Sequence, residues 1–449
     1  MDICAMKQIL LFGAGKSATS LIEYLLQNAS RENWRLTVAD ADAALAQKKV
    51  GDSPHGIAVS FDVMQDVQRQ AYIQQSDIVI SMLPPFLHEK VAFDCLLFGR
   101  NLLTASYVDP VMQSMKEAIA KKEILFLCEM GLDPGIDHMS AMKIIDEIHA
   151  NGGKIVSFKS HCGGLVAPEN DDNPWHYKIS WNPRNIVLAG KSGALLKIDN
   201  LVEKIPYESL FDNDELIHVE GLADYACYAN RDSLSYIPLY GLEEASTFVR
   251  TTLRHPSFCK AWNYVVKAGL THESSNPFLS VGYPTFTAWF NHTVSSNTPA
   301  KDYPSFLKLI VEERDRKLVD ELFRYLGLCD EEKIPSTAKS SADVLQLLVE
   351  SRLALKPHDR DMIVMLHEFD YTTGSETKRI SSSLVVKGED SLRTAMSKTV
   401  GLPLGIATKF ILNGTIRSKG LQIPVLKDIY EPVLQELQSF DIRFNEREL

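Results

Sequence analysis

The chain has 449 residues, which is enough for two or three domains. Hydrophobic residues make up 45% and charged residues 23%, an ordinary composition that excludes a disordered, fibrous or disulfide-stapled chain. The net charge of −11 argues against a general nucleic-acid binder, and no apolar run has the roughly 18 residues that would span a membrane.

The N-terminal part alternates between short apolar segments and helical patterns. Apolar segments predict strands at 8–12, 36–39, 57–61, 77–83, 101–105 and 124–127. Helical patterns follow the first strand and recur at 63–72, 87–98 and 111–121. Strands and helices that alternate at this pace predict a doubly wound parallel sheet.

A glycine-rich turn follows the first predicted strand and opens a helix. Its pattern is G-x-G-x-x-A, in which Gly13 permits a tight turn and Gly15 lets the backbone approach a pyrophosphate. Ala18 allows close packing, and the helix N-terminus offers N–H groups to the phosphates. This context predicts a Rossmann-type dinucleotide-binding domain. The residues of its cofactor-binding turn are Gly13, Ala14, Gly15, Lys16, Ser17 and Ala18.

Asp40 stands at the end of the second predicted strand, about 22 residues beyond Ala18. An acid there accepts hydrogen bonds from ribose hydroxyls and repels a 2′-phosphate, so we expect NAD rather than NADP. The alternative role for Asp40 is a helix cap or a solvated turn. Ligands of such sheets lie beyond the strand ends, which also carry Asp62, Val63, Leu83 and Pro84.

The second region mixes strand and helix patterns. A helix is predicted from Asp137 to His149, and strands at 154–160, 195–202, 363–371 and 380–386. Between 243 and 355 the pattern is mainly helical, most clearly at 307–326, and 336–342 reads as a flexible connector. We therefore expect an α+β domain with a helical insertion.

The segment GLDPGIDH at 131–138 lies where the two predicted domains meet, which is where substrate would reach a nicotinamide. Helix capping is the competing role, because Asp133 suits the N-cap, Pro134 the first helical position and Asp137 the helix dipole. His138 is a candidate general base or, alternatively, a packed histidine.

A second candidate segment follows the strand expected at 154–160. Its two glycines, after Cys162, would permit close approach to a ligand, and Cys162 could exchange protons; a buried inert cysteine is the alternative. Arginines beside hydroxyl residues, at 230–233 and 249–254, could hold carboxylates or could simply lie at the surface.

The seven cysteines are odd in number and never spaced as CxxC, which predicts no disulfide framework and no metal site. The N-terminal residues lack the pattern of a secretory signal. We therefore expect a cytoplasmic protein.

Several segments together resemble one family, the L-glutamate-forming saccharopine dehydrogenases, also called saccharopine reductases. The resemblance covers essentially the whole chain. It is carried by SDIVISMLP (76–84), TASYVDP (104–110), EMGLDPGIDHMSAMK (129–143), CGGLVAPENDDNPWHYKISW (162–181), NRDS (230–233), FVRTTLRH (248–255), RDMIVM (360–365) and AMSKTVGLPLGIATKFILNG (395–414).

The resemblance implies reversible oxidation of saccharopine to L-glutamate and 2-aminoadipate 6-semialdehyde. It also implies a homodimer and a C-terminal segment that returns to the dinucleotide domain. We accordingly expect a Rossmann-type domain at 1–135 and 400–449, an α+β substrate-binding and dimerisation domain at 136–242 and 356–399, and a helical subdomain at 243–355.

The resemblance also implies roles for individual residues. Asp133 and Cys162 would be the polar groups at the reacting centre, with Asp133 acting as a base or only orienting an amine. Arg231 and Thr252 would bind substrate carboxylates, Ser106, Tyr107 and Leu132 would line the same pocket, and Asp137 and Trp181 would contact the cofactor.

Two residues depart from the family pattern. Asp40 replaces the NADP-adapted strand end of fungal biosynthetic relatives, which favours NAD and lysine breakdown, with NADP as the alternative. Thr251 stands where a glycine is common.

Two other functions compete with saccharopine oxidation. A related dehydrogenase would act on carboxyspermidine-type polyamines or on lysine, although Arg231 argues against a polyamine. A non-enzymatic dinucleotide-binding regulator would have no need of Asp133 and Cys162.

Overall fold

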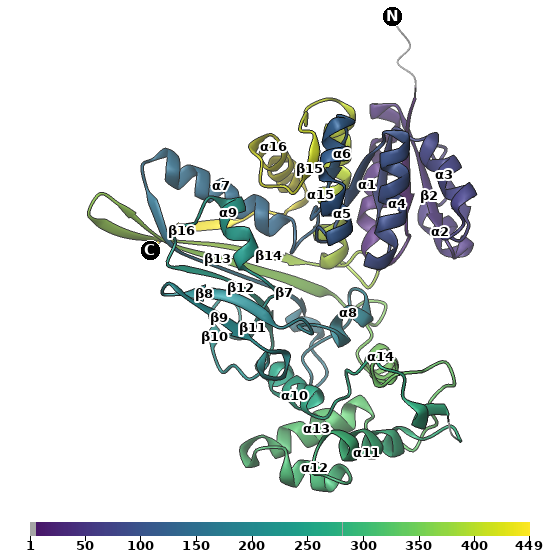
Figure 1. Ribbon diagram of the computed structural model, residues 1–449, viewed down its shortest axis with the longest axis vertical. Helices are drawn as coiled ribbons and strands as arrows, with labels where there is room; N and C mark the ends of the chain where they lie inside the picture. The colour runs from purple at the N-terminus through teal and green to yellow at the C-terminus, as the bar shows by residue number, and fades with distance from the viewer. Residues whose placement is uncertain (1–5, 281) are drawn as a thin grey trace, which may run out of the picture. The chain divides into compact units, whose positions relative to one another are not determined.

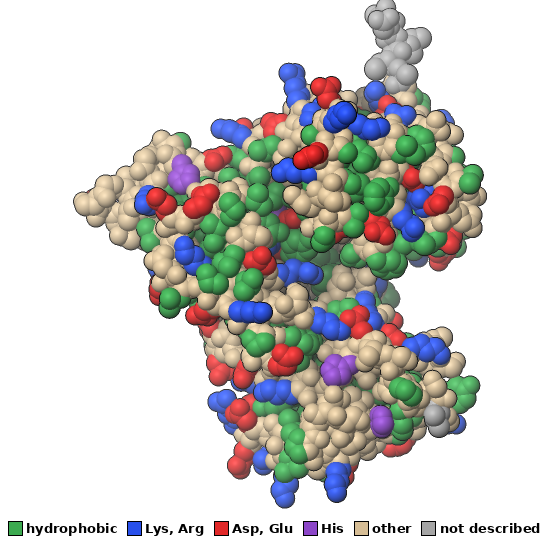
Figure 2. Space-filling model, viewed as in Figure 1, with side chains coloured by type: hydrophobic (Ala, Val, Ile, Leu, Met, Phe, Trp, Pro, Cys, Tyr) green, Lys and Arg blue, Asp and Glu red, His purple; other side chains and the backbone are tan. Residues whose placement is uncertain are grey.

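The computed structural model describes residues 6–280 and 282–449. The chain divides into two compact units (Figure 1). Unit 1 contains the residues up to Lys154 and Leu384–Asn445, and unit 2 contains Ile155–Ser383 and Glu446–Leu449. Acidic and basic side chains are interspersed over the visible face of each unit (Figure 2).

Unit 1 contains the predicted parallel sheet. Its strands are β1 (Lys7–Phe12), β2 (Trp34–Asp40), β3 (Gly56–Ser60), β4 (Ile78–Ser81), β5 (Asn101–Thr104), β6 (Leu125–Leu127) and β15 (Gly420–Gln422). They lie in the order β15-β6-β5-β4-β1-β2-β3, and each strand is parallel to its neighbours. Strands β4 and β6 are entirely buried, which explains why continuous apolar runs identify them. The Rossmann-type doubly wound sheet is confirmed.

The connecting helices differ in detail from the predicted ones. They are α1 (Thr19–Glu32), α2 (Ala43–Val50), α3 (Asp66–Gln74), α4 (Pro85–Phe98), α5 (Pro110–Ser114) and α6 (Lys116–Lys121). Helix α2 was not predicted; the Asp42 side chain caps it by accepting from the backbone N–H groups of Ala44 and Leu45. The single helix expected at 111–121 is two helices that meet at Met115.

The C-terminal segment returns to unit 1, as expected. Helix α15 (Ala395–Leu412) packs on α1 so closely that a Cβ on Gly401 would lie 2.8 Å from the Leu21 nitrogen. Strand β15 extends the parallel sheet, and α16 (Lys427–Leu437) packs on α7 (Ile136–Ala150). A domain boundary at 400 would therefore cut α15, and α7 belongs to unit 1 rather than to the substrate domain.

The start of α7 corrects the capping prediction. The residue at the N-cap is Gly135, with φ +146°, and no side chain caps the helix, so Asp133 is not its N-cap and Pro134 is not its first residue. The 131–135 loop instead closes on itself, because the Gly131 nitrogen donates to the Pro134 carbonyl (3.0 Å) and the Ile136 nitrogen to the Gly131 carbonyl (2.9 Å).

Unit 2 is built on a mixed sheet. Its main strands are β10 (Leu216–Ile217), β11 (Tyr225–Ala229), β12 (Thr247–Arg254), β7 (Lys154–Val166), β13 (Asp361–Thr373), β14 (Glu376–Lys387) and β16 (Asn445–Glu448), in that order. Strand β12 is parallel to β7 and antiparallel to β11. It lies inside a region expected to be mainly helical. The strand expected at 195–202 is two antiparallel strands, β8 (Ala194–Ile198) and β9 (Leu201–Ile205), joined by Asp199 and Asn200 at positive φ.

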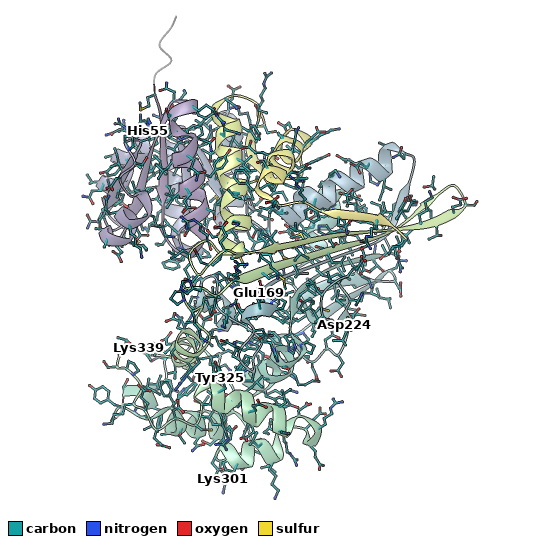
Figure 3. All side chains as sticks on the ribbon, turned by 180° about the vertical axis from the view of Figure 1, so that it is seen from behind. His55, Glu169, Asp224, Lys301, Tyr325 and Lys339 are labelled. Carbon is teal, nitrogen blue, oxygen red and sulfur yellow. The ribbon has the colours of Figure 1, made fainter. Side chains whose placement is uncertain are left out.

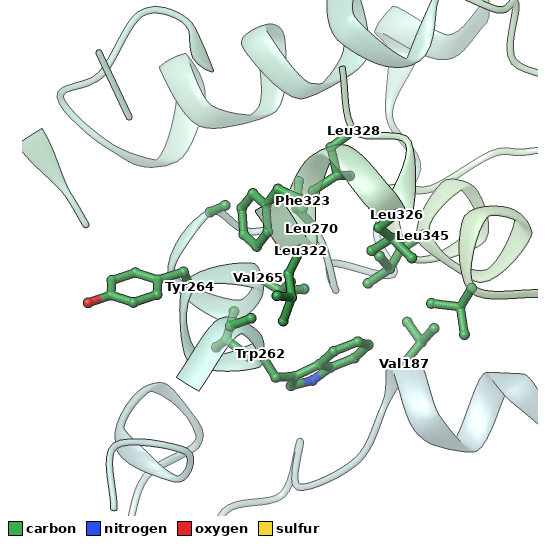
Figure 4. Packing of buried hydrophobic residues seen from close by; sticks show 14 of the residues in the cluster. Val187, Trp262, Tyr264, Val265, Leu270, Leu322, Phe323, Leu326, Leu328 and Leu345 are labelled. Carbon is green, nitrogen blue, oxygen red and sulfur yellow. The ribbon is translucent and has the colours of Figure 1, made fainter. Parts of the chain in front are cut away.

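The helices of unit 2 share a core with its sheet. They include α8 (Pro183–Val187), α9 (Ile237–Tyr240), α10 (Pro256–Lys267), α11 (Phe286–Asn297), α12 (Tyr303–Leu309), α13 (Arg316–Leu326) and α14 (Ser341–Arg352). One hydrophobic cluster joins Trp262, Leu322 and Leu345 of the helices (Figure 4) to Tyr228 of the sheet. The helical part accordingly belongs to unit 2. Lys301 and Lys339 lie on its outside (Figure 3).

Two helix predictions in this region need correction. The helix expected at 307–326 is interrupted: α12 ends at Leu309 and α13 begins at Arg316, whose side chain donates to the carbonyls of Leu307 and Val311. The supposed connector at 336–342 contains the capping box of α14, centred on Ser340.

Among residues 6–280 and 282–449, no helix is long and apolar enough to cross a membrane.

Candidate functional site

The glycine-rich turn has the geometry of a phosphate-binding loop. Gly13 has φ +96°, and a Cβ there would lie 2.8 Å from the Met82 carbonyl oxygen, so only glycine fits. Gly15 precedes the short helix Lys16–Ala18, and the space beside its Cα is open to 4 Å. The residues therefore fit a dinucleotide, whose pyrophosphate would meet the helix N-terminus across Gly15.

Asp40 ties the end of β2 to this turn. Its Oδ2 accepts a hydrogen bond from the Ala14 nitrogen (2.7 Å) and its Oδ1 one from the Asp42 nitrogen (2.9 Å). The carboxylate is partly exposed and is not a helix cap, since Asp42 caps α2. Asp40 thus combines a turn-holding role with a carboxylate that a ribose could reach.

A lysine that the sequence analysis did not single out lies at the same turn. Lys49 Nζ donates to the Gly15 carbonyl (2.5 Å) and to Thr19 Oγ1 (2.8 Å). Burial lowers the pKa of Lys49 to about 8, although Asp40 and Glu23 favour its charge. Lys49 thus joins α2 to the turn, and no local sequence pattern predicts this contact.

The other predicted cofactor residues have varied surroundings. Asp62 is exposed, and its Oδ1 accepts from the Met64 nitrogen (2.9 Å). Val63 and Leu83 pack on the hydrophobic cluster of the sheet, and Pro84 is the exposed N-cap residue of α4. In unit 2, Trp181 Nε1 donates to the Tyr177 hydroxyl (3.2 Å).

The ends of β4 and β5 are joined by a buried histidine. His88 Nδ1 lies 2.8 Å from Ser81 Oγ, and its Nε2 lies 2.7 Å from Oγ of Ser106, a predicted substrate residue. Burial lowers the pKa of His88 to about 4, so the imidazole is neutral near pH 7. Tyr107, the next predicted substrate residue, is partly buried.

An acid and a histidine after β6 form a second buried pair. Glu129 Oε2 lies 2.9 Å from Nε2 of His138, and Glu129 Oε1 accepts from the Val108 nitrogen (3.1 Å). His138 is fully buried, as expected for the packed histidine of the two alternatives. Asp137, predicted to bind cofactor, is also buried, and its Oδ1 accepts from the Gly135 nitrogen (2.5 Å).

These contacts hold the 131–135 loop in place. The Leu132 carbonyl accepts from the Asp137 nitrogen (3.0 Å), and the Leu132 side chain is buried. Asp133, between them, is partly exposed. The rigid loop therefore presents the Asp133 carboxylate from a fixed backbone.

In unit 2, three strands bring together a cysteine, a threonine and a tyrosine. Cys162 on β7 pairs in register with Thr252 on β12, which pairs with Tyr228 on β11. Cross-strand partners lie on the same face of a sheet, so these three side chains are neighbours. Packing requires the glycine after Cys162, because a Cβ on Gly163 would lie 2.7 Å from the Leu253 carbonyl oxygen. Moreover, β7 continues to Val166, so Cys162 lies within the strand, not after it.

Arg254 at the end of β12 is a buried cation with no acidic partner among the residues that the structure describes. Its guanidinium carbon lies 5.3 Å from the Tyr177 ring centre and 5.8 Å from that of Phe258, and the residue is 4% exposed. Nη1 donates to the Leu253 carbonyl (2.8 Å), whereas Nε has no hydrogen-bond partner within residues 6–280 and 282–449. No ion pair with a described carboxylate neutralises it.

Arg254 belongs to the sheet face that carries Cys162, Thr252 and Tyr228. Arg254 lies two residues after Thr252 on β12, and therefore on the same face of the sheet as Thr252 and its cross-strand partners Cys162 and Tyr228. Burying a guanidinium without a neighbouring anion carries a desolvation penalty of several kcal/mol. An anionic ligand would therefore complete this site. Arg231, the arginine favoured by the sequence analysis, is exposed at the end of β11 with φ +52°.

The segment DNPWHYKISW at 172–181 has a structural role in unit 2. Lys178 is buried and forms ion pairs with Asp172 (2.6 Å) and Asp359 (2.7 Å). Hydrogen bonds from Lys178 and Lys356 lower the pKa of Asp172 to about 2. Trp175 of the same segment is fully buried in the core, with its Nε1 donating to the Leu322 carbonyl (2.8 Å).

Comparison with known proteins identifies the family. Residues 9–127 match the saccharopine dehydrogenase NADP binding domain, and residues 131–442 match the saccharopine dehydrogenase C-terminal domain. The chain is 34% identical over 440 residues to the saccharopine dehydrogenase [NADP(+), L-glutamate-forming] of Saccharomyces cerevisiae, a match that covers 96% of this chain and 97% of the relative.

Two further matches agree. Alpha-aminoadipic semialdehyde synthase of Arabidopsis thaliana is 33% identical over 475 residues, which cover 98% of this chain and 44% of that longer protein. The structure of apo saccharopine dehydrogenase (L-Glu forming) from S. cerevisiae aligns with a TM-score of 0.85 and 32% identity, over 99% of this chain and all of that one. The chain therefore belongs to the saccharopine dehydrogenase family.

Proposed function

We propose that this protein oxidises saccharopine, with a nicotinamide dinucleotide as oxidant, to L-glutamate and 2-aminoadipate 6-semialdehyde. The secondary amine carbon loses a hydride and the nitrogen a proton, and water then cleaves the resulting imine. The bound dinucleotide would supply the hydride acceptor. The name of the yeast relative, L-glutamate-forming saccharopine dehydrogenase, supports this direction of cleavage.

Arg254 is the observation that carries the proposal. Saccharopine has three carboxylates, and a buried guanidinium with no acidic partner among the described residues is a preformed site for one of them. Thr252, in register with Cys162, would add a hydroxyl donor to the same face. A polyamine substrate, which is cationic, would be repelled by Arg254.

The chemical steps fall to Asp133 and Cys162. Hydride loss requires an uncharged amine, so a group must take its proton before or during the reaction. We propose that the partly exposed Asp133 carboxylate orients the amine and accepts this proton, and that Cys162 lies beside the reacting carbon. Ser106, Tyr107, Leu132 and Arg231 would hold the remaining polar groups of the substrate.

Asp40 makes NAD the preferred oxidant in this proposal. Its partly exposed carboxylate would accept hydrogen bonds from the ribose hydroxyls and repel a 2′-phosphate. The names of the matched domain and of the yeast relative specify NADP, so this preference separates the chain from that relative.

Substrate competition tests the proposal. Purified protein is assayed with saccharopine, lysine and carboxynorspermidine, each with NAD and with NADP, by the absorbance of the reduced nicotinamide. We expect turnover of saccharopine and none of the other amines. Faster turnover of lysine or of the polyamine would overturn the assignment, and dinucleotide binding without any turnover would favour a regulator.

A further inference from the structure

Three polar side chains form a continuous hydrogen-bonded chain below the ends of β4 and β5. Ser81 Oγ lies 2.8 Å from His88 Nδ1, and His88 Nε2 lies 2.7 Å from Ser106 Oγ. Ser81 and His88 are buried, with 1% and 2% exposed, whereas Ser106 is partly exposed. The first two residues have no part in the chemistry proposed above.

The imidazole in this chain is neutral. Burial lowers the pKa of His88 to about 4, against a smaller opposing effect of Asp109. A neutral imidazole has one N–H donor and one bare acceptor nitrogen. One serine must therefore donate to His88, and the other must accept from it.

The burial of Ser81 decides which atom donates in its hydrogen bond with His88. Its hydroxyl has no other hydrogen-bond partner within residues 6–280 and 282–449, so a proton on Nδ1 would leave the Ser81 proton buried with no acceptor. Ser81 therefore donates to Nδ1, and the proton of His88 sits on Nε2. The competing donor, Thr104 Oγ1, lies 3.5 Å from Nε2, at the outer limit of a hydrogen bond.

This direction fixes what Ser106 can do. Its oxygen accepts from His88 Nε2–H, and its backbone nitrogen donates to Thr104 Oγ1 (3.2 Å). The hydroxyl proton of Ser106 has no acceptor among the described side chains and is left to donate outward. Ser106 is thereby set as a hydrogen-bond donor.

We propose that His88 is a positioning residue that holds Ser106 as a donor to a substrate carboxylate and so selects a carboxylate over an ammonium group. A carboxylate can only accept hydrogen bonds and an ammonium can only donate them, so a fixed donor favours the first. The inference rests on the proposed function, because it assigns Ser106 to a carboxylate of saccharopine.

Matched substitutions separate this role from simple packing. A glutamine at 88 carries its amide to the position of Nε2 and can still donate to Ser106, whereas an asparagine reaches only the Ser81 side. We expect His88→Asn to raise KM for saccharopine about tenfold with kcat and dinucleotide affinity little changed, and His88→Gln to stay close to wild type. In a Ser106→Ala background, His88→Asn should have no further effect.

Histidine ¹⁵N NMR provides a readout that needs no turnover. The signals of His88, assigned by their loss in His88→Gln, should show a neutral ring with its proton on Nε2 from about pH 8 down to about pH 5. A proton on Nδ1, or effects of His88→Asn and Ser106→Ala that simply add, would overturn the proposal. If wild type does not oxidise saccharopine, the proposed function fails, while the NMR result still decides the direction of the serine–histidine–serine chain.

Discussion

Replacing Arg254 by methionine should separate activity from stability. Methionine keeps an apolar stem against Tyr177 and Phe258 but removes the charge. Loss of one partner from a buried, hydrogen-bonded charge pair costs about 2–5 kcal/mol. Because Arg254 is 4% exposed, we expect a loss near the middle of this range, or a fall of at least about 100-fold in kcat/KM for saccharopine.

Arg254→Met should have the same free energy of unfolding as the wild type, or a higher one. Without bound substrate, no described carboxylate pairs with Arg254, so its removal takes away a buried charge instead of stranding one. The control is Arg69→Met in unit 1. Arg69 is equally buried but bonded to Asp94 at 2.6 Å, so its loss should lower the free energy of unfolding by about 3–5 kcal/mol.

Two measurements check this reasoning. Steady-state kinetics gives kcat/KM for saccharopine, and urea unfolding of the ligand-free protein gives the free energy of unfolding. Dinucleotide affinity, from fluorescence titration, should be unchanged in Arg254→Met. The reasoning would be refuted if Arg254→Met were destabilised as much as Arg69→Met while kcat/KM for saccharopine stayed within about threefold of wild type.

Three further predictions follow from unit 1. Asp40→Ala should lower kcat/KM for NAD by about tenfold or more and for NADP much less, because both dinucleotides use the turn that Asp40 holds but only NAD depends on an acceptor at the ribose; a wild type that already prefers NADP would contradict this. Gly13→Ala should abolish dinucleotide binding, measured by calorimetry, since its Cβ would lie 2.8 Å from the Met82 carbonyl oxygen, whereas Gly152→Ala, at an open position remote in sequence, should bind normally. The pKa of His88 is lowered from 6.5 to about 4. Between these two pH values, His88 takes up a proton in the unfolded chain but not in the folded protein. Stability should therefore fall as pH drops through this window, by up to about 3 kcal/mol for this residue, and His88→Gln should flatten that part of the urea-unfolding profile; an unchanged slope would count against a neutral buried ring.

The Rossmann-type sheet was predictable because its strands are buried on both faces and therefore appear as apolar runs. Strand β12 was not, because FVRTTLR places two arginines in a strand, and only the fold shows that Arg250 and Arg254 are buried. Its register with β7, which sets Cys162 beside Thr252, depends on residues about 90 apart in the sequence. The glycine-rich turn, by contrast, is local and could be read directly.

The contacts around the site show a second limit of sequence reasoning. Asp133 has the pattern of an N-cap, yet the 131–135 loop closes on Gly131 and the helix begins at Ile136. His88 and Ser106 lie on different elements, and no short motif joins them. Backbone hydrogen bonds within the loop decided the first case, and packing of side chains across strand ends decided the second.

Stoichiometry of the reaction tests the central claim most directly. Purified protein is given a limiting amount of saccharopine with excess NAD, and the NADH and L-glutamate formed are measured together. The account predicts one NADH and one L-glutamate for each saccharopine consumed. Absence of both products with either NAD or NADP, from protein that binds the dinucleotide, would contradict it.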